Sequence, residues 1–239
     1  MPDRPTIRTL GLLMLGLLSF LPTAKAAPVD DLARLCDEYW EGYLRANPTA
    51  ATAIGDRRFD DRLDDITPAG IAREQRRLES VLARARSLDD QALDSGGRLT
   101  RAALIEEVEG QIARASCGFE EWVIDPLGGP QVEFMNLADY TTIDSPQDAA
   151  RYVRRCRLMG HYLDDHIANL KSGLAQGKTS SRDAVRKTVD QLDALTSRSI
   201  DEWAILAPSK AEHAKWSASD RTRFRGDLTA VVRDGVRPA

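Results

Sequence analysis

The sequence predicts an all-α protein, a multi-helix array with essentially no sheet. Apolar residues recur at spacings of three and four along most of the chain, and several segments begin with a capping residue followed by proline. No stretch alternates convincingly between polar and apolar residues over six positions. Aromatic residues make up only 6% of the chain, which suits a helical core built from Leu, Ala and Val.

The first expected helix spans residues 29–46, where the apolar positions form one broad stripe. Asn47 is expected to cap a second, short helix with Pro48 at its first position, and Gly55 is expected to end that helix. Residues 56–66 are rich in Asp and Arg and lack periodicity, so we interpret them as a loop.

A Thr-Pro pair starts the next expected helix, which spans residues 67–88. The Asp-Ser-Gly-Gly sequence at 94–97 is interpreted as a break before a helix over 98–116, whose apolar stripe includes Leu99. Residues 117–145 form the longest stretch without helical rhythm. A loop of this length inside a compact domain is often functional, and part of it is expected to form a short strand or helical turn.

The C-terminal part of the chain is again helical. Ser145 and Asp148 form a capping box that opens the longest expected helix, over 146–176. Gly160 and Gly173 inside this helix predict close helix contacts or frayed ends. Further helices are expected at 181–196 and after a second capping box at 217–220.

The N-terminus has the features of a secretory signal peptide. It combines a basic start, an uncharged and mostly apolar run over 10–21 and the small-x-small pattern at 24–26. The apolar run is too short to cross about 30 Å of hydrocarbon, which requires about 20 residues. We therefore expect residues 1–26 to be a cleaved signal peptide, and residues 27–239 to form a periplasmic or secreted helical domain without stable membrane insertion.

Charge and cysteine content exclude some classes of function. The net charge is −4 and the two signs are interspersed, which argues against a nucleic-acid partner. Cys36, Cys117 and Cys156 lack the spacing of metal ligands. We interpret them as small buried apolar residues, and one disulfide stays open as an alternative.

Spacing alone nominates no catalytic residue and no metal ligand. His161 and His166 are five residues apart, which places their rings about 140° apart on a helix and prevents them from sharing a metal ion. His161 with Asp165 has an allowed spacing, but a polar helix face is the simpler explanation. The chain contains no HExxH motif, no GxSxG motif and no glycine-rich phosphate loop.

Five segments, in this order, resemble the landmarks of one known family. They are YLRANPTAAT at 43–52, LDD at 63–65, DPLGGPQ at 125–131, SPQDAARYV at 145–153 and LKSGLAQGK at 170–178. The family is the bacterial domain of unknown function 885, whose members resemble zinc metallopeptidases. The resemblance covers about residues 30–239.

The resemblance implies that this chain is the N-terminal part of a larger helical metallopeptidase-like fold. The zinc motif of the family, a HExxPGH-type helix, lies in the C-terminal half, and nothing in this chain matches it. Zinc is therefore implied for the full-length family, while no cofactor and no catalytic residue are assigned here. A Gly-Pro helix stop near the end argues locally for a complete chain, but the resemblance implies truncation. The expected partners are the missing C-terminal half and a peptide substrate.

The preferred interpretation is the N-terminal helical part of an exported zinc-peptidase-like hydrolase, inactive alone, with residues 117–145 lining a substrate channel. Gly128, Gly129 and Gln131 are the candidate channel residues, and the simpler alternative is that they form a tight turn supporting the core. The rival interpretation of the whole chain is a self-contained, non-catalytic helical module that binds a periplasmic partner.

Overall fold

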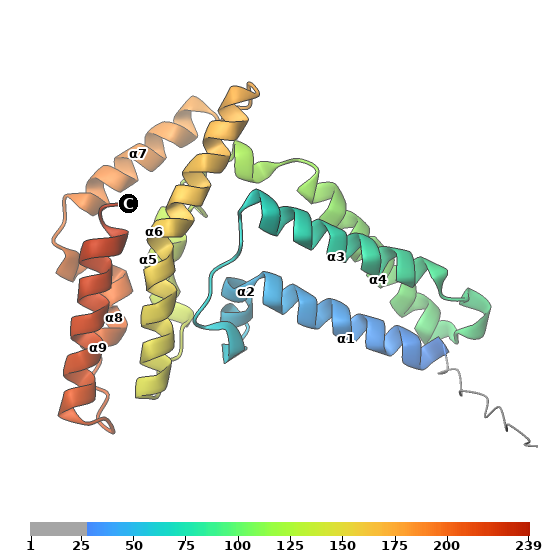
Figure 1. Cartoon of the computed structure of the whole chain (residues 1–239), viewed down its shortest axis with the longest axis horizontal. Helices are drawn as coiled ribbons and strands as arrows, with labels where there is room; N and C mark the ends of the chain where they lie inside the picture. The colour runs from blue at the N-terminus through green and yellow to red at the C-terminus, as the bar shows by residue number, and fades with distance from the viewer. Residues whose placement is uncertain (1–27) are drawn as a thin grey trace, which may run out of the picture.

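The computed structural model describes residues 28–239, and every regular element in this part of the chain is a helix (Figure 1). The all-α prediction is confirmed for these residues, whereas the predicted signal peptide over 1–26 lies outside them. None of the described helices is long and apolar enough to cross a membrane. The α-helices are α1 (Pro28–Ala46), α2 (Pro48–Ala53), α3 (Pro68–Ser87), α4 (Ser95–Ala115), α5 (Pro130–Tyr140), α6 (Pro146–Ala175), α7 (Arg182–Thr196), α8 (Ala207–Lys210) and α9 (Ala218–Val231).

The helices form two lobes that meet beside α2 (Figure 1). The first lobe contains α1, α3 and α4, and the second contains α5, α6, α8 and α9, with α7 against α5. Each lobe has its own apolar core. The first core includes Leu32, Leu35, Leu78, Val81, Ala85, Leu104 and Val108. The second includes Phe134, Leu137, Tyr152, Met159, Ile205, Leu206 and Leu228.

Side-chain caps start the helices largely where the sequence predicts them. The Thr67 hydroxyl accepts a hydrogen bond from the Gly70 amide at 3.0 Å and caps α3. Ser145 and Asp148 form the predicted capping box of α6. Asn47 behaves differently, because its side-chain amide donates back to the Tyr43 carbonyl oxygen at 2.8 Å and does not cap α2.

Three sequence predictions in the middle of the chain are wrong. α4 begins at Ser95, inside the predicted break, because the Asp94 carboxylate accepts a hydrogen bond from the Gly97 amide at 2.7 Å and offsets the low helix propensity of the two glycines. Leu99, predicted to face inward, is 73% exposed. Within the predicted irregular stretch at 117–145, residues 130–140 form the three-turn helix α5.

The two glycines inside α6 mark close contacts, and neither lies at a frayed end. A Cβ atom at Gly160 would lie 2.7 Å from the carbonyl oxygen of Gly235, and one at Gly173 would overlap the carbonyl oxygen of Glu121. Backbone from another segment therefore approaches α6 at both positions, which requires residues without a side chain.

The cysteines follow the sequence interpretation in two cases. Cys156 is buried and Cys36 is half-buried, as expected for small apolar residues in helix packing. Cys117 is exposed, which the sequence did not predict. All three thiols are free in the structure.

Candidate functional site

The most developed polar arrangement in the described part of the chain lies where the two lobes meet. Arg155 of α6 is fully buried, and its Nη2 donates to the Phe59 carbonyl oxygen and the Thr52 hydroxyl, both at 2.7 Å. The same nitrogen lies 3.2 Å from the carbonyl oxygen of Pro48. Buried Asp60 lies 3.9 Å from Arg155 and accepts a hydrogen bond from Thr52 at 2.6 Å. These five residues, here called the lobe junction, fix the α2 segment on α6.

The lobe junction is not optimised for stability alone. Nε and Nη1 of Arg155 are buried and have no hydrogen-bond partner among the described residues. Burial lowers the pKa of Arg155, and the charge of Asp60 opposes this shift. A buried donor without a partner costs about 1 to 3 kcal/mol. Because an apolar pair of the same size would avoid that cost, we infer that the junction selects one arrangement of the lobes.

Ion pairs at the surface continue the junction. Arg57, at the start of the 3-10 helix η1 (Arg57–Phe59), lies 2.9 Å from Asp144 and 2.7 Å from Asp148 of the second lobe. Burial acts to raise the pKa of Asp148, but the hydrogen bonds from Ser145 and the charge of Arg57 have the larger combined effect. The pKa of Asp148 is therefore below its usual value. The capping box of α6 is thus also a contact with η1, which packs on α2 where the lobes meet.

Asp64 is another carboxylate near the lobe junction, and its pKa shifts in the opposite direction to that of Asp148. Its side chain accepts hydrogen bonds from the Thr49 hydroxyl at 3.0 Å and the Thr49 amide at 3.3 Å. Burial raises the pKa of Asp64 in spite of these bonds and of the charge of Arg155. The folded state therefore binds a proton at Asp64 more tightly than the unfolded state does.

This raised pKa predicts a pH dependence of stability. Protonation of Asp64 favours the folded state, so its contribution to stability grows as the pH falls through the raised pKa towards about 4. Asp64→Asn removes this titration and keeps an acceptor for Thr49. Urea unfolding of both proteins between pH 7 and pH 4 should show the variant at its greatest advantage at pH 7. A stability difference that does not change with pH would contradict the assignment.

The candidate channel residues Gly128, Gly129 and Gln131 lie together in one tight turn that leads into α5. The Gly129 amide and the Gln131 side-chain amide both donate to the Asp125 carbonyl oxygen, at 3.0 and 2.9 Å. Gly129 is buried, and a Cβ atom there would overlap the Asp125 carbonyl oxygen and the Gln131 amide. Gly128 is exposed, and its neighbour Leu127 is 84% exposed.

A pair of glutamines fixes this turn against α7. Nε2 of Gln131 lies 3.1 Å from Oε1 of Gln191, whose own amide donates to the Pro126 carbonyl oxygen at 2.8 Å. The Gln131 side chain is thus occupied by contacts within the protein. The groups that the turn presents to solvent are the Leu127 side chain and the backbone of Gly128.

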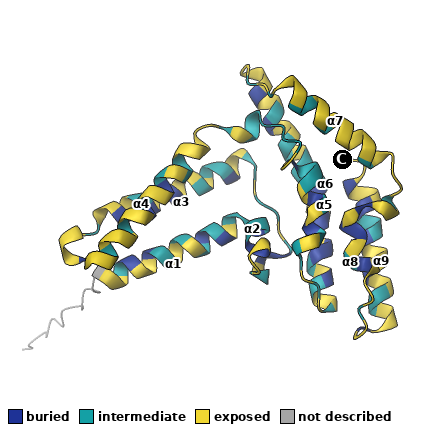
Figure 2. Cartoon of the chain, turned by 180° about the vertical axis from the view of Figure 1, so that it is seen from behind, coloured by how far each residue is buried: buried dark blue, intermediate teal, exposed yellow. Residues whose placement is uncertain are grey.

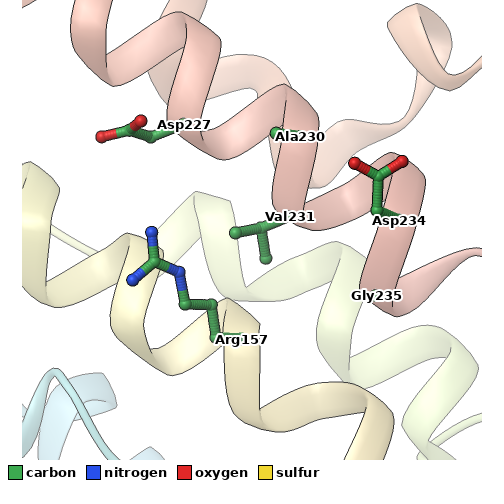
Figure 3. A pocket seen from close by; sticks show the side chains of 6 residues that line it. All are labelled: Arg157, Asp227, Ala230, Val231, Asp234 and Gly235. Atoms are coloured by element: carbon green, nitrogen blue, oxygen red, sulfur yellow. The ribbon is translucent and has the colours of Figure 1, made fainter.

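A separate shallow hollow lies between α6 and the end of α9 (Figure 3). Its volume is about 350 Å³, and the guanidinium of Arg157 points across it towards Asp227 (Figure 3). Asp234 and Gly235 belong to a π-helical turn, Val232–Val236, that continues α9. Such turns are frequent at functional sites, but no spacing in the sequence indicates one here. The lining residues are Arg157, Asp227, Ala230, Val231, Asp234 and Gly235, so the hollow is separate from the channel candidates.

The three histidines occupy unrelated environments. His161 is an exposed side chain 3.6 Å from Asp165, and His213 stacks on Trp216 with ring centroids 4.0 Å apart. Burial lowers the pKa of His166. Between residues 28 and 239, no group of three or more His, Cys, Asp or Glu side chains is placed to hold a metal ion. The described donors do not fit the zinc site that the family resemblance implies.

We compared the sequence with the sequence models of known protein families. The sequence model of the family described as "Bacterial protein of unknown function (DUF885)" matches residues 48–239. The chain belongs to this family. The DUF885 match includes the lobe junction, the turn at 125–131 and every helix from α2 to α9. A comparison with curated proteins finds no match.

Proposed function

We propose that the chain supplies the helical, non-catalytic part of an exported zinc-peptidase-like hydrolase of the DUF885 family. The observation that carries the proposal is the rigid turn at 125–131, one of the segments that resemble the family. Hydrogen bonds from Gly129, Gln131 and Gln191 fix its backbone, while Leu127 and Gly128 face solvent. A substrate-contacting wall requires a fixed backbone with accessible groups, and this turn has both.

The three candidate residues have different roles in this proposal. Gly128 leaves backbone accessible to an extended peptide, which recognises partners mainly through its main-chain hydrogen bonds. Gly129 permits the close turn, and Gln131 holds that turn in place. In this proposal the zinc and its ligands come from another segment of the hydrolase, as the family resemblance implies.

The proposal predicts that purified residues 27–239 hydrolyse no peptide, even with added zinc. A catalytic zinc needs about three protein ligands and an open position for water. The assay is cleavage of a mixed peptide library, with a mock purification as control for contaminating peptidases. Chelator-sensitive cleavage that is abolished by His161→Ala or His166→Ala would show that this chain is itself an enzyme.

One observation favours a second function, a self-contained helical module that binds a periplasmic partner. α7 contains no buried residue, and its Val189 and Leu192 are exposed apolar side chains. The genomic reading frame after Ala239 separates the two proposals. A HExxH-type helix encoded there supports the hydrolase, and a stop codon supports the module.

A further inference from the structure

The tip where α6 joins α7 concentrates positive charge in an acidic protein. Residues 171–187 contain five basic residues and one acidic residue, although the whole chain has a net charge of −4. The segment includes the end of α6, a short loop and the first turns of α7. The basic residues are Lys171, Lys178, Arg182, Arg186 and Lys187.

Only two of these five basic side chains form ion pairs within the described part of the protein. Lys178 pairs with Glu121, and Arg186 lies 3.2 Å from Asp183. The other three basic side chains are exposed and have no ion-pair partner within residues 28–239. They are Lys171, Arg182 and Lys187.

Packing explains several residues of the LKSGLAQGK segment but leaves two unexplained. Gly173 lies against the backbone of Glu121, and Gly177 has a φ of +79°, the left-handed conformation that ends α6. Lys171 and Leu174, one helical turn apart, have no such role, and the Leu174 side chain is 64% exposed.

α7 carries exposed apolar and basic side chains of its own. Val185, Val189 and Leu192 recur at helical spacing, and Arg182 and Arg186 border this stripe on the helix surface. Figure 2 shows α7 exposed over most of its length. Another face of α7 carries Gln191, which bonds to the turn at 125–131.

We propose that the tip at 171–187 is a peripheral docking surface for an anionic phospholipid membrane. Unpaired basic side chains attract lipid phosphates, and exposed aliphatic side chains between them enter the region between headgroups and acyl chains. A nucleic acid or an acidic protein surface would use the basic residues, but it gives no comparable environment to Leu174. This inference is independent of the proposed hydrolase function.

The test is co-sedimentation of residues 27–239 with vesicles of phosphatidylglycerol and phosphatidylcholine, and with vesicles of phosphatidylcholine alone. We expect binding to the anionic vesicles that weakens with salt, and little binding to the neutral ones. Each basic side chain at an anionic bilayer contributes about a five-fold gain in partitioning. Lys171→Glu with Lys187→Glu should therefore weaken binding more than about 25-fold. Leu174→Ser should weaken it about ten-fold.

Matched control variants test whether the effect depends on where the substituted residues lie, and not only on the change in charge or in leucine content. Arg76→Glu with Lys215→Glu makes the same charge change at exposed residues elsewhere, and Leu99→Ser removes a leucine of α4 that is also largely exposed. Both controls should bind anionic vesicles like the parent, and circular dichroism checks that every variant folds. The proposal is overturned if the parent does not bind or binds both vesicle types equally, or if the controls lose as much binding. Binding to heparin or RNA that matches vesicle binding and is unaffected by Leu174→Ser would also overturn it.

Discussion

Arg155→Met should lower the free energy of unfolding by about 3 to 5 kcal/mol, the usual cost of removing one partner of a buried ion pair. The substitution removes the buried cation 3.9 Å from Asp60, which keeps only the partly exposed Arg57 at 3.8 Å as an ion-pair partner. It also removes the donor that lies 2.7 Å from the Phe59 carbonyl oxygen. Urea unfolding measures the loss. Because the lost contacts join the two lobes, small-angle scattering should also show a broader range of overall dimensions in the variant.

The neighbouring residue provides the control. Arg154 has a side chain that is 53% exposed and lies 3.5 Å from Asp61, so Arg154→Met should cost less than about 1 kcal/mol. Adding Asp60→Asn to Arg155→Met should restore part of the stability, because it removes a buried negative charge whose remaining ion-pair partner is the partly exposed Arg57, 3.8 Å away. Equal losses for the Arg154 and Arg155 variants would contradict the role given to the lobe junction.

Gly173→Ala should destabilise the protein by about 1 to 3 kcal/mol, because the new methyl group overlaps backbone, which cannot rotate away as a side chain can. The overlapping atom is the carbonyl oxygen of Glu121. The matched change is Gly226→Ala in α9, where nothing lies within 4 Å of the added Cβ. It should stabilise the protein by about 0.5 to 1 kcal/mol through helix propensity. Thermal unfolding shows whether each variant is more or less stable than the parent. A destabilised Gly226→Ala or a neutral Gly173→Ala would contradict this packing.

Helices with strong local signals could be predicted from the sequence, and α5 could not. α3 and α6 begin with a hydroxyl cap followed by proline, which satisfies free amides and restricts the backbone at the same place. α5 begins at Pro130 after Gly129, which has no capping side chain, and only Phe134 and Leu137 are buried along it. Packing against the rest of the second lobe, which no local pattern records, stabilises this helix.

The lobe junction could not be predicted for a different reason. Arg155 is one of several basic residues along α6, and neither its spacing nor its neighbours show that it is buried. Its acceptors include the backbone oxygens of Pro48 and Phe59, which lie about a hundred residues earlier and carry no sequence signature. A tight turn at 125–131 could be predicted, because paired glycines indicate a tightly turned backbone in any fold.

The most direct test of the proposed function is the zinc content of purified residues 27–239 after dialysis. Zinc should be measured by elemental analysis on protein that was first loaded with the metal. If the chain is the helical, non-catalytic part of the hydrolase, the ratio should fall far below one zinc per chain, because His161, His166 and His213 lie in separate environments. One tightly held zinc per chain would contradict the account.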